Sequence, residues 1–302
     1  MITIVTSTRN RPEKLRNSII SLFNNTYENY EIIIIDQSID NTIKLVVKKI
    51  KNDKIRYIKK PGSGKAWAIN LALQESSGEI LTVLDDDCIA DKNWLNNIRQ
   101  SFEKNKNISG LFGRILPYKP KLHQREICPC IFLSKQKKII DKPCVHWQNI
   151  GFGNNMAFKR EIFGKVGVFK EWLGAGSLSK SAEDAEFSLR CLIKGYKLLY
   201  NPKMIVYHNR WLTEEEHRRQ CLFYSCGEVA CYGYFGFQGV ELGKKVVRKN
   251  FKNSYEKFEK SLELIFSFNK YGLRLFFHSL REFYFLIRGL AVGWYFSKKD
   301  PL

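Results

Sequence analysis

The segment EILTVLDDDCIA (residues 79–90) places three consecutive carboxylates directly after a short apolar run. The apolar run, from Ile80 to Leu84, has the length and composition of a buried strand. Two like charges about 4 Å apart repel by roughly 4 kcal/mol at an effective dielectric constant of about 20. Three acids at the end of a strand therefore call for a compensating partner, and a hard cation is the best explanation.

Strands and helices are expected to alternate around this segment. Apolar runs with the composition of strands occupy residues 2–7, 30–36, 54–60, 79–85 and 109–116. Helical spacing of apolar residues occupies 11–24, 40–50, 64–76 and 91–104. This alternation predicts an α/β fold with a Rossmann-like, doubly wound and mostly parallel sheet. Ligands of such sheets bind beyond the carboxyl ends of the strands, so we expect Asp36 and the triplet Asp85–Asp87 to converge there.

The later part of the chain is less regular. Residues 117–148 contain four prolines and are expected to form an irregular insertion. Residues 151–163 are expected to form a Gly/Asn turn that enters a helix, and two short strands are expected to end at His208. From about Thr213 the sequence is helical and strongly aromatic. We therefore predict an α/β domain over residues 1–210 and a mainly helical extension over residues 211–302.

The composition limits the classes of partner. The chain has 302 residues and a formal net charge of +20, which favours a polyanionic neighbour such as a phosphate-rich substrate or an anionic membrane. The Lys and Arg residues are spread along the chain and form no recognised nucleic-acid motif, so no nucleic-acid partner is expected. The eight Cys are expected to be reduced thiols. No signal peptide or spanning helix is recognised, which favours the cytoplasm.

The acidic triplet has the chemistry of a cation site. Carboxylate oxygens suit Mg²⁺ or Mn²⁺, which complete their coordination shell with phosphate oxygens and water. In an extended segment side chains alternate, so Asp85 and Asp87 would face one way and Asp86 the other. The alternative is an acidic turn in which Asp87 or Asp91 caps the following helix.

Two further groups have chemistry that fits such a site. Glu183 and Asp184 open the helix in AEDAEFSLR (182–190), where an Asp can serve as a general base for a substrate hydroxyl. His208 ends an apolar strand, and imidazole is a usual ligand of Mn²⁺-type ions. Each group taken alone is also compatible with ordinary helix charge or with a structural histidine.

Seven segments in order resemble a family 2 glycosyltransferase of the GT-A fold, of the non-processive bacterial type. They are STRNRPEKL (7–15), IIIDQSIDNT (33–42), GKAWAINLAL (64–73), GEILTVLDDD (78–87), GFGNNMAFKRE (151–161), EDAEFSLR (183–190) and VYH (206–208). Together they span about two thirds of the chain. Residues 209–223 contain no Q-x-x-R-W, the signature of processive synthases, so the resemblance favours an enzyme that adds one sugar.

The resemblance implies roles for particular residues. The nucleotide-sugar site would comprise Thr8, Arg9 and Asp36 at the base, Lys65 at the base or diphosphate, Asp85 and Asp86 at the ribose, and Asn154 and Asn155 at the donor sugar or acceptor. Asp87 and His208 would hold Mn²⁺ or Mg²⁺. Asp184 would be the catalytic base, with Glu183 beside it.

The function that the resemblance implies is metal-dependent transfer with inversion. One sugar would move from a nucleotide diphosphate sugar to a hydroxyl of a glycan or lipid-linked glycan, in cell-surface polysaccharide or glycolipid synthesis. One alternative is a nucleotidyltransferase acting on sugar phosphates. That class needs a Gly-rich loop after the first strand, and TSTRNRP (6–12) has no Gly. A second alternative is a non-catalytic sugar- or membrane-binding module. The presence of the acidic triplet, the Glu183–Asp184 pair and His208 in one chain disfavours this alternative.

The last part of the chain has an amphipathic pattern. In residues 271–296, Arg274, Arg281 and Arg288 recur every seven residues and share a helix face. A broader apolar side carries Phe276, Phe277, Leu280, Phe283, Ile287, Leu290 and Trp294. This is the pattern of an interfacial helix, which would place the protein peripherally at the inner face of the plasma membrane. The alternative is a helix docked on the catalytic domain with a solvated Arg stripe.

Overall fold

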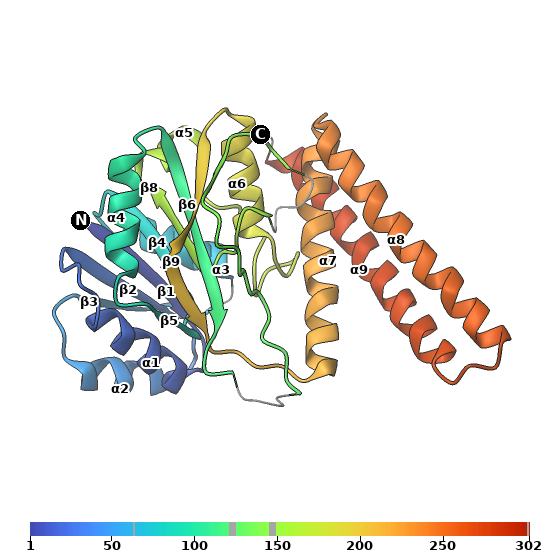
Figure 1. Ribbon diagram of the computed structural model, residues 1–302, viewed down its shortest axis with the longest axis horizontal. Coiled ribbons are helices and arrows are strands. Elements are labelled where there is room, and N and C mark those ends of the chain that lie inside the picture. Colours follow the sequence, from blue (N-terminus) through green and yellow to red (C-terminus); the bar gives the residue numbers. More distant parts are fainter. Residues whose placement is uncertain (63, 121–124, 145–148, 301) are drawn as a thin grey trace. The chain divides into compact units, whose positions relative to one another are not determined.

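The computed structural model describes residues 1–62, 64–120, 125–144, 149–300 and 302 (Figure 1). The chain divides into two compact units. Unit 1 comprises Met1–Glu171 and Glu183–Glu214, and unit 2 comprises Trp172–Ala182 and Glu215–Leu302. The short segment Trp172–Ala182 thus belongs with the C-terminal residues, although it precedes the last part of unit 1 in the sequence.

A mixed sheet forms the centre of unit 1. Its strands are β1 (Ile2–Thr8), β2 (Tyr30–Asp36), β3 (Ile55–Lys59), β4 (Ile80–Leu84), β5 (Cys88–Ala90), β6 (Ile108–Pro117), β7 (Lys138–Ile140), β8 (Asn155–Lys159) and β9 (Lys197–His208). The order is β3-β2-β1-β4-β8-β6-β9-β5, and β7 also pairs with β9. The strands β3, β2, β1 and β4 are parallel, as are β6 and β9. The predicted α/β fold with a mostly parallel sheet is confirmed.

Helices of unit 1 cover both faces of this sheet. They are α1 (Pro12–Phe23), α2 (Thr42–Ile50), α3 (Lys65–Gln74), α4 (Trp94–Lys104), α5 (Glu161–Val166) and α6 (Glu183–Ile193). In β2, Ile32 and Ile34 belong to a core that includes α1 and α4 residues. The alternate residues Ile33 and Ile35 belong to a second core with α3, α5 and α6 residues. The strand is therefore apolar at consecutive positions because both of its faces are buried.

Three strands differ from the sequence expectation. β8 replaces the expected turn at residues 155–159 and runs antiparallel to both β4 and β6. β5 is a three-residue strand, too short for its periodicity to be recognised. β9 is one strand instead of two, because its pairing with β6 shifts register between Gly113 and Arg114. Pro202 lies at this irregularity, where the missing backbone N–H of proline is tolerated.

The irregular segment expected at residues 117–148 is partly described. It contains β7, and isolated bridges join Ile115 to Phe132 and Ile127 to Leu212. Residues 121–124 and 145–148 lie outside the described residues.

Unit 2 contains the C-terminal helices α7 (Glu214–Phe237), α8 (Glu241–Phe266) and α9 (Gly272–Lys299), and α8 and α9 pack side by side (Figure 1). Gly289 and Gly293 of α9 lie against the backbone of α7 at Cys226 and Ala230, where a Cβ atom would clash. The predicted mainly helical extension is confirmed. Among the described residues, no helix combines the length and apolarity needed to cross a membrane.

Candidate active site

The acidic triplet after β4 forms a turn, which the backbone N–H of Cys88 closes by donating to Asp85 O at 3.0 Å. Arg11 Nη1 lies 3.1 Å from Asp86 Oδ1 and 3.3 Å from Asp87 Oδ2. The expected alternation of the three side chains is therefore wrong, because one guanidinium contacts neighbouring acids. A turn, unlike an extended strand, lets consecutive side chains reach the same cation.

Lys65, the first residue of α3, connects this turn to the start of α6. Its Nζ lies 2.7 Å from Asp85 Oδ1 and 3.5 Å from Glu183 Oε1, and its side chain is only 12% exposed. Burial lowers the pKa of Lys65, but the charges of Asp85 and Glu183 outweigh burial and raise the pKa above its ordinary value. The two acidic groups that the sequence singled out thus share one buried cation.

Asp184 is held by backbone donors. Gly153 N–H donates to its Oδ2 at 2.6 Å and Ala185 N–H donates to its Oδ1 at 2.9 Å. A Cβ atom at Gly153 would lie 3.0 Å from Asp184 Oδ2, so a larger residue there would push the carboxylate away from the Gly153 N–H. Burial, together with the neighbouring charge of Glu183, raises the pKa of Asp184 to about 7. A carboxyl group that titrates near neutrality is suited to accept a proton from a hydroxyl.

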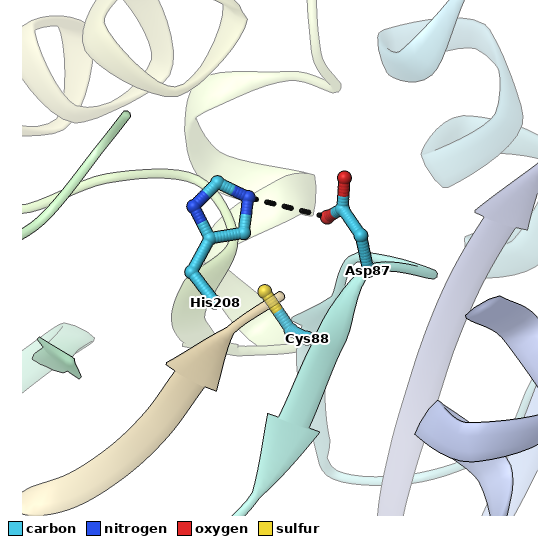
Figure 2. A group of neighbouring side chains, drawn as sticks. All are labelled: Asp87, Cys88 and His208. Carbon is cyan, nitrogen blue, oxygen red and sulfur yellow. Dashed lines mark ion pairs between the residues drawn. The ribbon is translucent and has the colours of Figure 1, made fainter. Parts of the chain in front are cut away.

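Asp87, Cys88 and His208 offer three ligand atoms that lie within 4.8 Å of one another (Figure 2). The group arises from strand pairing, because Cys88 of β5 lies opposite His208 of β9. His208 Nε2 lies 3.3 Å from Asp87 Oδ1, and the dashed line in Figure 2 marks this pair. Burial lowers the pKa of His208, but hydrogen bonds and charge interactions with Asp87 and Cys128 together outweigh burial and raise the pKa to about 10.

The surroundings of this group suit a hard divalent cation. His208 Nδ1 lies 2.7 Å from the carbonyl oxygen of Pro129, which can only accept a hydrogen bond. Nδ1 therefore keeps its proton, and a bound metal would replace the proton of Nε2 beside the Asp87 carboxylate. Burial raises the pKa of Cys88 well above its ordinary value, so this residue is a neutral thiol and a poor ligand for Mn²⁺ or Mg²⁺.

Thr8 and Asp36, which end β1 and β2, are register partners. Thr8 Oγ1 donates to Asp86 Oδ2 at 2.7 Å, so Thr8 lies between Asp36 and the triplet. Asp36 Oδ2 accepts from Tyr57 Oη at 2.6 Å, and Asp36 Oδ1 accepts from the backbone N–H of Ser38. Arg9, the next residue after β1, is exposed.

Asn154 and Asn155 differ in their surroundings. Asn155 is fully buried, and its side-chain amide accepts from Trp94 Nε1 and donates to the carbonyl oxygens of Arg114 and Met204. This corrects the expectation that Asn155 faces the donor sugar or acceptor, because its amide is used inside the protein. Asn154 Oδ1 is buried without a hydrogen-bond partner among the described residues, which leaves it able to bind a ligand.

Sequence reasoning missed Arg11 and Tyr57 as site residues. Arg11 stands in the quoted segment STRNRPEKL, and its only signal was its position next to the Pro12 that starts α1. Glu186, in contrast, forms an ion pair with Arg190 at 2.8 Å on the same helix. It is therefore part of the packing of α6 and not of the acidic group at its start.

The sequence model of a family described as "Glycosyl transferase family 2" matches residues 3–167. An uncharacterized glycosyltransferase of Rickettsia bellii is 33% identical over 108 residues, which are 35% of this chain and 16% of that protein. The glucosyl-dolichyl phosphate glucuronosyltransferase of Haloferax volcanii is 20% identical over 215 residues, which are 68% of each protein. The matched part of the chain thus spans only a small fraction of the Rickettsia protein.

Among solved structures, the fold is similar to that of a mannosyltransferase from Pyrobaculum calidifontis in complex with GDP-Man and Mn²⁺. The TM-score is 0.59 at 13% sequence identity, over 96% of this chain and 86% of the other. At this identity the similarity concerns the fold alone, and it identifies the sheet of unit 1 as the GT-A type. Asp184 and His208 lie beyond the residues that the family model matches.

Proposed function

The chain belongs to glycosyltransferase family 2, whose model matches more than half of its residues, and we propose that it is an inverting, metal-dependent enzyme of the non-processive type. As a member of this family it transfers a sugar from a nucleotide sugar. The proposal adds the residues of the site, a divalent metal and the transfer of one sugar to a hydroxyl.

The observation that carries the proposal is the ion-paired group around Lys65. Lys65 Nζ contacts Asp85 beyond β4 and Glu183 at the start of α6. Because Asp184 follows Glu183 and Asp87 belongs to the same turn as Asp85, a candidate base and a candidate metal ligand both adjoin this group. This is the arrangement that a transferase needs to act on a hydroxyl next to a diphosphate.

The nucleotide is proposed to bind along the ends of β1, β2 and β4. Thr8, Arg9 and Asp36 would lie at the base, and Asp85 and Asp86 at the ribose. Thr8 and Asp86 are already hydrogen bonded to each other, which supports their placement in one subsite. Asp36 is proposed to act through the Tyr57 hydroxyl as well as directly, since that hydroxyl is bound to its carboxylate.

Transfer is proposed to be a single displacement. Asp184 accepts the proton of the acceptor hydroxyl, and the hydroxyl oxygen forms a bond to the anomeric carbon as the bond to the diphosphate oxygen breaks. The diphosphate leaves with the electron pair, and the positive charge of Lys65 would stabilise the leaving group. Attack from the face opposite the leaving group inverts the anomeric centre. Asn154, with its unpartnered Oδ1, would bind a hydroxyl of the donor sugar or acceptor.

Asp87 and His208 are proposed to hold Mn²⁺ or Mg²⁺. When bound, the divalent ion neutralises the charge that develops on the departing diphosphate. Pro129 O would keep His208 in the tautomer whose Nε2 faces the ion. Arg11, which contacts Asp86 and Asp87, would hold the turn in place before metal and donor arrive.

The acceptor is proposed to be a glycan or a lipid-linked glycan of cell-surface synthesis, used at the inner face of the plasma membrane. Residues 1–210 would carry the chemistry, and residues 211–302 would serve docking to an acceptor or a membrane. The absence of Q-x-x-R-W in residues 209–223 supports transfer of one sugar without processive movement.

The test is donor binding and turnover in parallel. UDP-, GDP- and dTDP-sugars with Mn²⁺ should raise the melting temperature of the wild-type protein by mass action, and the stabilising donor should be hydrolysed or transferred. Asp184→Asn should keep the donor-induced shift and lose turnover. Normal turnover by Asp184→Asn would remove Asp184 as the base, and the absence of any donor-induced shift would contradict the proposed site.

A further inference from the structure

The helix α9 exposes a continuous row of large apolar side chains. Leu273, Phe277, Leu280, Tyr284, Ile287 and Trp294 lie four and three residues apart in turn, with Ala291 at the remaining position. The six large side chains are 43% to 61% exposed, although such residues are usually buried. Because these spacings return to the same side of a helix, the side chains form one line, here called the apolar stripe.

The opposite side of α9 provides its packing. The buried residues of the helix are Gly272, Ser279, Glu282, Leu286, Gly289, Gly293 and Ser297, most of which are small. Gly289 and Gly293 lie directly against α7, and Glu282 forms an ion pair with Lys257 of α8 at 2.8 Å. The inner face of α9 is thus already occupied within unit 2, and the apolar stripe contributes little to that packing. A continuous row of exposed apolar side chains bordered by polar residues is typical of an interaction surface.

Basic and aromatic residues border the apolar stripe. Arg274, Arg281 and Arg288 each follow a stripe residue by one position and repeat every seven residues. The end of α8 and the turn that follows it add Phe266, Phe268 and Tyr271, which are 79%, 98% and 58% exposed. Lys270 Nζ lies 5.1 Å from the ring centroid of Tyr271. Trp and Tyr beside Lys and Arg are the side chains that favour the boundary between lipid headgroups and acyl chains.

We propose that the apolar stripe of α9 and the adjoining aromatic turn bind the surface of an anionic lipid bilayer. The apolar side chains enter the upper acyl region, and the exposed Arg274 and Arg281 contact the phosphates of the headgroups, whereas Arg288 is half-buried and donates to Leu178 O at 3.2 Å. Since the apolar stripe runs along the whole helix, the helix lies in the plane of the surface. This docking differs from the sequence expectation in its residues, because Phe276, Phe283 and Leu290 are only partly exposed.

The charged residues beside the apolar stripe favour a bilayer over a second copy of the chain as its binding partner. If the apolar stripe were the seam of a coiled coil, the positions bordering it would be Arg274, Arg281 and Arg288 on one side and Phe276, Phe283 and Leu290 on the other. An antiparallel pair would bring Arg against Arg, and a parallel pair would bring Arg against apolar residues. Neither arrangement offers an acid to Arg274 and Arg281, whereas an anionic bilayer does.

The test is flotation of the full chain with vesicles, without donor or metal, so that its result does not depend on the proposed transfer activity. We expect binding to vesicles of phosphatidylcholine with phosphatidylglycerol, and weaker binding to phosphatidylcholine alone. The triple variant Phe277→Ser, Ile287→Ser and Trp294→Ser should lower the partition coefficient at least about tenfold, since each apolar side chain contributes to transfer. Replacing Arg274 and Arg281 by Gln should remove the preference for anionic vesicles.

Matched controls use exposed residues of unit 1. The variant Ile39→Ser, Leu133→Ser and Val168→Ser removes three exposed apolar side chains, and the variant Lys48→Gln and Lys49→Gln removes two exposed charges. Both controls should bind vesicles as the wild type does. A second measurement leaves the apolar stripe of the wild type intact. Brominated lipids should quench the tryptophan fluorescence of the wild type, and the variant Trp294→Phe should lose most of that quenching.

Three results would overturn the proposal. The first is that the wild type does not bind anionic vesicles, and the second is that the stripe variant binds as well as its control. The third is that light scattering shows a dimer of the wild type that the stripe variant alone dissociates, which would assign the stripe to a second copy.

Discussion

Lys65 Nζ lies 2.7 Å from Asp85 Oδ1, so a cation from the first turn of α3 compensates a carboxylate at the end of β4. The same Nζ lies 3.5 Å from Glu183 Oε1 of α6. One side chain thus ties two acidic groups that are separated by about a third of the sequence. Its removal would leave both carboxylates without their shared positive charge.

Replacing Lys65 by Met should destabilise the fold strongly at neutral pH. Breaking a largely buried ion pair by removing one partner costs about 3 kcal/mol, because the other charge stays buried without compensation. The loss should shrink as the pH falls, since protonation removes the uncompensated negative charge. Urea denaturation at about pH 7 and about pH 5 measures the free energy of unfolding under both conditions.

The matched control is Lys165→Met. Lys165 pairs with Glu161 one turn away, and both side chains are more than half exposed. A surface pair of this kind contributes less than about 1 kcal/mol, so the control should change stability little at either pH. Equal losses for the two variants would show that Lys65 is not the compensating charge of the site.

The pH dependence of transfer should report Asp184. Because burial and Glu183 raise the pKa of this carboxyl group to about 7, only part of the enzyme holds the base form at neutral pH. The value of kcat/KM should therefore rise with pH through about 7 and level off above it, since deprotonation creates the base. Initial rates at low donor concentration in buffers of constant ionic strength measure this limb.

A flat profile across this range would contradict Asp184 as the base, provided that the protein stays folded. Thermal melts at each pH provide that check. The conservative variant Asp184→Glu should keep a rising limb at reduced rate, because the added methylene displaces the carboxylate from the Gly153 and Ala185 donors.

The sequence predicted the sheet and the chemical groups because both depend on local patterns. Continuous apolar runs such as YEIIIID (30–36) identify strands buried on both faces, and acids at a strand or helix end are visible as composition. The pairing of β8 between β4 and β6 was not visible, because a five-residue strand after a Gly/Asn turn has no distinctive period. That strand places Asn155 in the core opposite Leu84.

Contacts between distant residues were the other part that the sequence could not supply. Arg11 reaches Asp86 and Asp87 across more than seventy residues, and nothing near Arg11 in the sequence indicates acids as its partners. Similarly, the register of β5 on β9 sets Cys88 against His208, and register depends on the whole sheet. Residue types were predictable, whereas their partners required the fold.

Metal binding should depend on Asp87 and His208 and not on Cys88. Asp87→Asn and His208→Gln should each weaken Mn²⁺ binding at least about tenfold, because each removes a donor atom of the site. Cys88→Ser should leave Mn²⁺ binding unchanged but weaken binding of Cd²⁺, which prefers sulfur. Electron paramagnetic resonance of free Mn²⁺ and competition with Cd²⁺ measure both affinities.

If Cys88→Ser lost as much Mn²⁺ affinity as Asp87→Asn, the thiol would be a ligand of Mn²⁺. That result would contradict the prediction that Cys88 does not bind this ion. Asp40→Asn serves as the control, because Asp40 is an exposed carboxylate that accepts hydrogen bonds from the backbone N–H and the hydroxyl of Thr42 in its own turn. It should bind Mn²⁺ as the wild type does.

Substitutions of the neighbouring residues Asn154 and Asn155 should affect different properties, with Asn155 needed for stability and Asn154 for transfer. Asn155→Ala should lower the free energy of unfolding by about 3 kcal/mol, because Trp94 Nε1 and two carbonyl oxygens lose their buried partner. Asn154→Ala should cost about 1 kcal/mol or less, because its Oδ1 has no partner to lose and its Nδ2 lies 3.7 Å from Cys88 Sγ. Transfer should show the reverse order: Asn154→Ala should lower kcat/KM, whereas the folded fraction of Asn155→Ala should keep it. Urea denaturation and initial rates on the same samples measure both quantities, and a loss of transfer confined to Asn155→Ala would return that residue to the substrate site.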